Sequence, residues 1–153
     1  MKKGICLFFL VLLAVFSYLR EILFTSINAT LAGTASFYAK TARIEFFLTK
    51  SAATLVQLKY GMTIGFTLLF AFITVLGLRL TFTNKLPSQL ALTLYAICGM
   101  VASLVIAYSL VTNRFDSVYS FLRLIIEYLH NPLVYLIMSA GYLGVLYSQQ
   151  EKK

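Results

Sequence analysis

The chain has 153 residues, of which 60% are hydrophobic and 12% charged, and its formal net charge is +8. Globular domains carry about 25% charged residues, so this composition excludes an ordinary soluble fold and predicts a small integral membrane protein. Its basic residues stand at the ends of apolar runs and form no stripe, which argues against nucleic-acid binding.

The first apolar run follows two lysines and predicts a membrane helix over about residues 4–20. A cleaved secretory signal is the alternative, but the small residues near Ala14 and Ser17 would make a poor processing site. Residues 20–33 carry an adjacent charge pair and turn-forming side chains. We expect this stretch to leave the membrane as a connection.

Residues 34–59 show an amphipathic helical pattern, apolar on one side and basic or polar on the other. A basic amphipathic helix often lies in the headgroup plane, and packing against the membrane helices is the alternative. The side chains that we expect to contact lipid headgroups are Lys40, Arg43, Lys50 and Lys59.

Two strong spans follow, predicted over about residues 60–80 and 88–112. The first contains a charge-free run between Lys59 and Arg79 that comes close to crossing a hydrocarbon core of about 30 Å. Neither the charge-free run (residues 61–78) nor the second span holds a charged residue, and the sequence indicates no transporter-like pair of broken helices. These features disfavour a channel.

Small residues in these spans would let helices approach one another closely. They are Gly61 with Gly65 in the first span, which match GxxxG, and Gly99 with Ala102 in the second. We expect them to pack within the chain, with dimerisation as the alternative.

Residues 115–130 form a second and sharper amphipathic pattern, in which Arg123 and Glu127 are spaced to pair across one helical turn. An interfacial helix is the expected structure. The last span, predicted over about residues 131–148, opens with an Asn-Pro pair that supplies a helix cap and a first-turn proline.

The sequence therefore predicts an all-α membrane helical bundle, with residues 1–153 forming a single domain. We expect about four transmembrane helices and two amphipathic interfacial helices. Four spans place both termini on one side of the membrane, and the positions of lysine and arginine favour the cytoplasmic side.

The sequence shows no pattern for catalysis, cofactor binding or metal binding. Cys6 and Cys98 lie in apolar runs, where the thiolate form is disfavoured. We expect His130, the single histidine, to be an interfacial or capping residue, roughly 20 Å in depth from Cys98. The prediction is a non-enzymatic protein without a cofactor or a metal.

Three passages together carry a resemblance to a known family. Residues 20–31 read REILFTSINATL, residues 58–60 read LKY at the entry to the central span, and residues 123–132 precede the last apolar helix. In these passages the chain resembles the small membrane proteins associated with exosortases in Bacteroidota. The resemblance implies a non-enzymatic accessory protein in the bacterial inner membrane. Its partner would be an exosortase, a transpeptidase-like cysteine protease that handles proteins with C-terminal sorting signals.

The resemblance implies an interface or folding motif at Arg20, Glu21 and Asn28. The plainer interpretation of these residues is a charge pair at a helix end followed by a turn. The candidate interface also includes Arg123, Glu127 and Pro132.

Three functions remain as hypotheses. The first is an accessory protein that binds another membrane protein through helix–helix contacts, with the lipid bilayer as its surroundings. The alternative is a small transporter or channel subunit that works as a homo-oligomer. The third is a lipid-interface protein that senses anionic lipids through Lys40, Arg43 and Lys50.

Overall fold

The computed structural model describes residues 3–33, 44–112 and 115–150. These residues form six α-helices and no strand. The helices are α1 (Lys3–Leu31), α2 (Glu45–Leu48), α3 (Ala52–Thr81), α4 (Leu86–Thr112), α5 (Phe115–Leu129) and α6 (Leu133–Gln150).

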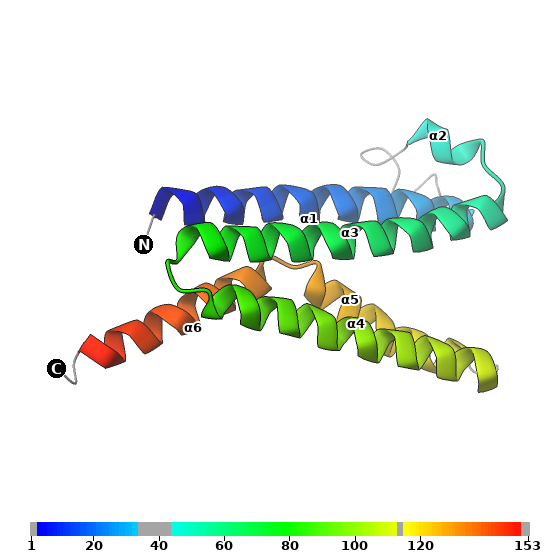
Figure 1. The fold of residues 1–153 in the computed structure, drawn as a ribbon. Coiled ribbons are helices and arrows are strands. Elements are labelled where there is room, and N and C mark those ends of the chain that lie inside the picture. Colours follow the sequence, from blue (N-terminus) through cyan, green and yellow to red (C-terminus); the bar gives the residue numbers. More distant parts are fainter. Residues whose placement is uncertain (1–2, 34–43, 113–114, 151–153) are drawn as a thin grey trace.

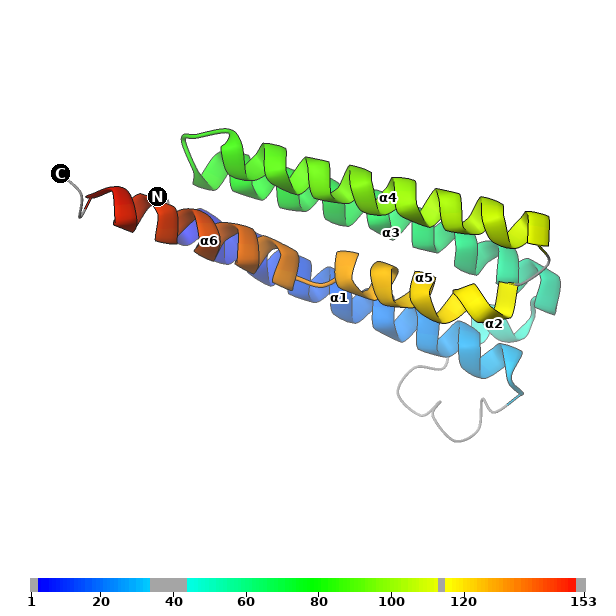
Figure 2. The ribbon, with the colours of Figure 1, turned by 90° about the horizontal axis from the view of Figure 1, so that it is seen from below.

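The long helices lie side by side as a bundle (Figure 1). α1 and α3 pack antiparallel along most of their lengths, and α4 packs on the other side of α3. α5 runs back along α4 to the middle of the bundle, and α6 continues from there toward the end at which α1 begins (Figure 2). The segments Phe121–Leu129 and Leu133–Val145 meet at a bend of 60°.

Three helices are long and apolar enough to cross a membrane, namely α1, α3 and the Leu86–Tyr108 part of α4. The bent pair formed from α5 and α6 passes the same test as one unit, so the described residues hold up to four spans. Large apolar side chains such as Leu68 and Phe72 are exposed on the outside of the bundle, as expected for contact with lipid. The predicted fold class, an all-α membrane helical bundle, is confirmed.

The main apolar core occupies the half of the bundle where α1 begins and α3 ends. Its buried side chains are Phe9, Leu13, Phe70, Ile73, Leu78, Phe82, Ala91, Tyr95, Leu129, Val134 and Tyr135. A smaller cluster at the other end of α1 joins α1, α2 and α3 through Ile27, Phe47 and Leu55.

Gly77 is the point of closest approach among the described glycines. A Cβ atom there would lie 2.7 Å from Cγ of Phe9 and 2.9 Å from Cε2 of Tyr135, whereas nothing lies within 4 Å of such an atom at Gly61 or Gly65. The expectation that the GxxxG pair packs within the chain is therefore wrong. The contact that needs a glycine joins α1, α3 and α6 instead.

The first helix is longer than predicted. Residues 20–31 belong to α1, so the expected connection over residues 20–33 is wrong for most of its length. Asn28 and Thr30 indicated a turn, but they satisfy their polar groups inside the helix and across to α3. The helix ends at Leu31, and the turn that follows contains Gly33, whose φ of +66° is favourable for glycine.

The first amphipathic segment also differs from the prediction of one helix over residues 34–59. Residues 34–43, which include Lys40 and Arg43, lie outside the described part of the chain. α2 is a single turn, and α3 begins at Ala52 because the hydroxyl of Ser51 accepts a hydrogen bond from the N–H group of Thr54. Residues 52–59 of the segment lie in α3 and lead directly into the central span.

The bend between α5 and α6 keeps its backbone groups hydrogen-bonded. The hydroxyl of Tyr95 donates to the carbonyl oxygen of Leu129, at 3.0 Å, where α5 ends. Asn131 accepts a hydrogen bond from the N–H group of Leu133, also at 3.0 Å, so the predicted cap of the last helix is confirmed. The structure thus contains a broken helix pair that the sequence did not indicate.

Candidate functional site

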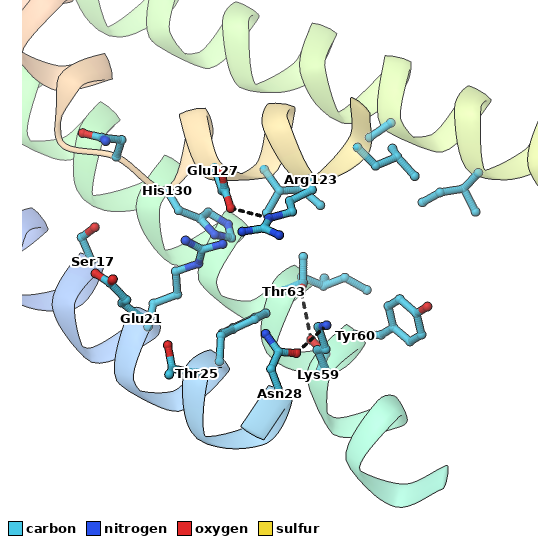
Figure 3. Close-up of a pocket in the computed structure, with 18 residues that line it drawn as sticks. Ser17, Glu21, Thr25, Asn28, Lys59, Tyr60, Thr63, Arg123, Glu127 and His130 are labelled. Atoms are coloured by element: carbon cyan, nitrogen blue, oxygen red, sulfur yellow. Dashed lines mark hydrogen bonds and ion pairs between the residues drawn. The ribbon is translucent and has the colours of Figure 1, made fainter. Parts of the chain in front are cut away.

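A polar cavity of about 550 Å³ lies beside this bend, enclosed by α1, α3, α4 and α5 (Figure 3). Its charged or titratable lining residues are Arg20, Glu21, Lys59, Tyr60, Arg123, Glu127 and His130. α1 and α5 each supply two of these groups, α3 supplies Lys59 and Tyr60, and His130 lies in the turn after α5. The run of α3 between Lys59 and Arg79 holds no charged residue, as the sequence indicated.

The cavity brings together five of the six candidate interface residues. Arg20, Glu21 and Asn28 reach it from α1, and Arg123 and Glu127 reach it from α5. These two groups are about a hundred residues apart in the sequence. Pro132, the sixth candidate, is not part of the lining and lies in the turn between α5 and α6.

His130 is the most deeply buried polar residue at the site, with 1% of its surface exposed. Its Nε2 atom lies 2.7 Å from Oγ1 of Thr67, and that hydroxyl also donates to the carbonyl oxygen of Thr63. A threonine hydroxyl has one proton to give, so Oγ1 of Thr67 accepts the proton of Nε2. In a neutral imidazole this arrangement leaves Nδ1 as an acceptor. Nδ1 is buried and has no hydrogen-bond partner among the described residues.

A charge-free segment of a spanning helix is the part expected in the hydrocarbon layer. His130 lies beside the middle of such a segment, the part of α3 between Lys59 and Arg79. Thr67, the hydrogen-bond partner of His130, and Phe70, on which the imidazole ring stacks at 5.4 Å, both lie near its centre. A polar group at this depth is costly and is usually functional.

Arg20 reaches a similar depth from α1. Its guanidinium lies over the ring of Phe24, at 5.0 Å from the ring centroid, and that ring contacts the ring of Phe66 on α3. α1 and α3 are antiparallel, so Arg20 lies one turn beyond Phe24, in the direction of Phe70. The Nε atom of Arg20 is buried and lacks a hydrogen-bond partner in the described part of the chain.

Two polar interactions join residues in the outer part of the cavity, an ion pair and a hydrogen bond from a lysine. Nε of Arg123 lies 2.7 Å from Oε1 of Glu127, so the pairing predicted from their spacing is confirmed. Nζ of Lys59 donates to Oδ1 of Asn28, at 2.8 Å, and thereby links α1 to α3. Lys59, which we expected among the lipid headgroups, therefore lines the cavity. Lys50 lies over the ring of Phe46, outside the site.

Sequence reasoning missed His130 and Thr67. It placed His130 at a membrane face because residues 115–130 read as an interfacial helix. α5 instead runs back along α4, and the contact of Leu129 with Tyr95 returns the chain to the level of Cys98. The expected separation in depth is therefore wrong, although Cys98 itself does not line the cavity. The usable signal was the single histidine directly before an Asn-Pro helix break.

The cavity can hold a polar group inside the membrane layer by hydrogen bonds from α1 and α5. Within the described ranges, no three His, Cys, Asp or Glu side chains are grouped so that they could hold a metal ion. No family model, no curated protein and no solved structure matched the chain in these comparisons.

Proposed function

We propose that this chain is a non-enzymatic accessory protein that binds another membrane protein through the polar cavity. The partner class is an exosortase-type protein-sorting enzyme of the bacterial inner membrane, as the sequence resemblance implies. The observation that carries the proposal is the pair of unpartnered buried atoms, Nε of Arg20 and Nδ1 of His130, in one cavity inside a helical bundle.

Unpartnered polar atoms are expensive in a membrane protein. A buried donor or acceptor without a partner costs about 1–3 kcal/mol, and lipid offers no hydrogen bonds in place of water. A polar side chain from a neighbouring membrane helix would relieve both atoms at once. The cavity residues therefore favour association with a second protein.

The chemistry of the lining supports a binding role. The lining includes the hydroxyl group of Thr63, which donates a hydrogen bond to a backbone carbonyl of its own helix. The hydroxyl group of Thr67, one turn further along α3, does the same. The thiols of Cys6 and Cys98 are not part of the lining. The site therefore presents hydrogen-bonding groups and charges without a thiol nucleophile.

A small transporter or channel subunit is the second candidate function. The observation that favours it is the broken helix pair, since transporters commonly place their substrate sites at such breaks near the middle of the bilayer. Arg20, Glu21 and Glu127 would then face a solute instead of a protein.

The deciding experiment is purification of the full chain from its native host in mild detergent, followed by mass spectrometry of the proteins that accompany it. We expect a stoichiometric membrane protease with the natural chain, and at least a tenfold loss of it with Arg20→Ala. The matched control is Arg79→Ala, because Arg79 is exposed at the far end of α3.

A homo-oligomer without a partner would contradict the accessory function. Equal recovery of the partner with both variants would show that the cavity is not the interface. Solute flux in reconstituted vesicles that is lost with Arg20→Ala would instead establish the transport function.

A further inference from the structure

We infer that the cavity binds a carboxyl group together with one proton, held between Arg20 and His130. Nε of Arg20 donates to one carboxyl oxygen, and Nδ1 of His130 accepts the proton carried by the other. The inference rests on the proposed function, in that it takes the cavity as the binding site and names the group that enters it.

The first argument is complementarity of donors and acceptors. Oγ1 of Thr67 accepts a hydrogen bond from the N–H group at Nε2, so Nδ1 of the neutral His130 ring offers a lone pair, whereas Nε of Arg20 offers a hydrogen-bond donor. A ligand that satisfies both must accept at one atom and donate at another. A carboxylic acid does so across its two oxygens. A bare carboxylate would set its lone pair against that of Nδ1, which is why a proton must accompany it.

The second argument is the charge of Arg20. The guanidinium presents Nε and a terminal nitrogen side by side, which matches the two oxygens of a carboxyl group. Arg123 already has Glu127 as its ion-pair partner, but no carboxylate lies within ion-pair distance of Arg20 in the described part of the chain. Arg20 and His130 both line this cavity, and each has a buried polar atom without a partner among the described residues. A carboxyl group between them would meet both side chains.

Other charged and titratable groups surround His130. The charged ones are Arg20 and Glu21 on α1, Lys59 on α3, and Arg123 and Glu127 on α5, and the neutral ones are Tyr60 on α3 and Tyr95 on α4. Among the described lining residues, α6 contributes no titratable group. The proton comes from the aqueous phase and travels with the carboxylate, so no redox or covalent step is involved.

The single histidine makes the test direct, because a chain labelled with ¹⁵N-histidine has one pair of imidazole resonances. The full chain in lipid nanodiscs is titrated with sodium acetate, and with sodium chloride at equal ionic strength as the control. We expect acetate, but not chloride, to change the ¹⁵N chemical shift of Nδ1. The shift should move from the value of an unprotonated nitrogen toward that of a nitrogen that accepts a strong hydrogen bond. Each carboxylate binds together with one proton. The apparent affinity for acetate should therefore rise about tenfold for each unit by which the pH is lowered between pH 8 and pH 6.

A second arm distinguishes the two sources of a carboxyl group. A membrane-spanning peptide with one central glutamate represents a partner helix, and its glutamine twin is the control. A response to the glutamate peptide alone supports a carboxyl group on a partner's helix, and a response to acetate supports a free carboxylate. A response to neither, or an equal response to both peptides, overturns the inference.

The variants test the role of Arg20. Arg20→Gln should weaken the response at least tenfold, and Arg20→Lys should also weaken it because lysine keeps the charge but lacks the side-on pair of donors. Arg79→Gln should leave the response unchanged. Binding that is unaffected by both Arg20 variants, or that does not depend on pH, would overturn the inference.

These outcomes separate the inference from the proposed function. Co-purification of a membrane protease with no carboxyl response refutes the inference and leaves the accessory function standing. A carboxyl response in a chain that recovers no partner supports the inference, refutes the accessory function and favours transport.

Discussion

Gly77 offers the sharpest test of how the bundle is packed, through the substitution Gly77→Ala. A Cβ atom at this position would lie 2.7 Å from Cγ of Phe9 and 2.9 Å from Cε2 of Tyr135. Cγ is the ring atom bonded to Cβ of Phe9, so it cannot move away by a side-chain rotation in the way that the end of a flexible side chain can. The hydroxyl of Tyr135 is hydrogen-bonded to Thr81 at 3.0 Å, so its ring is also held.

Two opposing terms set the magnitude. Replacing glycine by alanine inside a helix gains about 0.8–1.0 kcal/mol, and overpacking a close contact costs about 1–3 kcal/mol. Gly65, on the same helix, has nothing within 4 Å of the added atom and should show only the gain. We therefore expect Gly77→Ala to be less stable than Gly65→Ala by about 1–3 kcal/mol.

The assay is equilibrium unfolding of both variants in bicelles, for example by steric trapping. A third chain carries Gly77→Ala together with Phe9→Ala, which removes Cγ and the ring, and a fourth chain carries Phe9→Ala alone. This double-mutant cycle should recover at least about 0.5 kcal/mol of the penalty through coupling of the two sites. Equal stabilities for Gly77→Ala and Gly65→Ala would refute the close packing of α1, α3 and α6.

The same assay tests three further contacts. Tyr95→Phe leaves the buried carbonyl group of Leu129 without its partner and should lower the free energy of unfolding by about 1–3 kcal/mol; no change would show that this bond does not hold the end of α5. Asn131→Ala removes the cap of α6 and should cost about 0.5–2 kcal/mol, and an unchanged stability would contradict that role. A double-mutant cycle on Arg123 and Glu127, whose side chains are 67% and 47% exposed, should give a coupling of about 0.3–0.5 kcal/mol that shrinks with added salt. A coupling above about 2 kcal/mol would mean that the pair is not solvated.

The sequence was sufficient to locate the two central spans, in α3 and α4, because their signal is local. An uncharged apolar run long enough to cross the bilayer needs no knowledge of its neighbours, and α3 and α4 follow such runs. The pairing of Arg123 with Glu127 was also predictable, since residues four apart on a helix always share a face. Both predictions depend only on residues close together in the chain.

The position of the cavity was not predictable in the same way. Arg20 and Asn28 read as a helix end and a turn because polar residues after an apolar run usually mark the water boundary. In the structure they stay helical because α3 supplies a partner for Asn28, in the form of Lys59. The depth of His130 depends on the direction in which α5 packs, which no local pattern encodes.

The arrangement of cavity and core bears on the choice between accessory protein and channel. The lining residues belong to the half of the bundle where α1 ends and α3 begins, and reach only as far as the bend. The other half is filled by the main core, where Phe9 and Tyr135 close on Gly77. A polar group can thus enter from one side as far as Arg20 and His130, but a path across the membrane would require this core to separate. A site that is closed on one side suits a protein that holds a partner's side chain better than one that conducts ions.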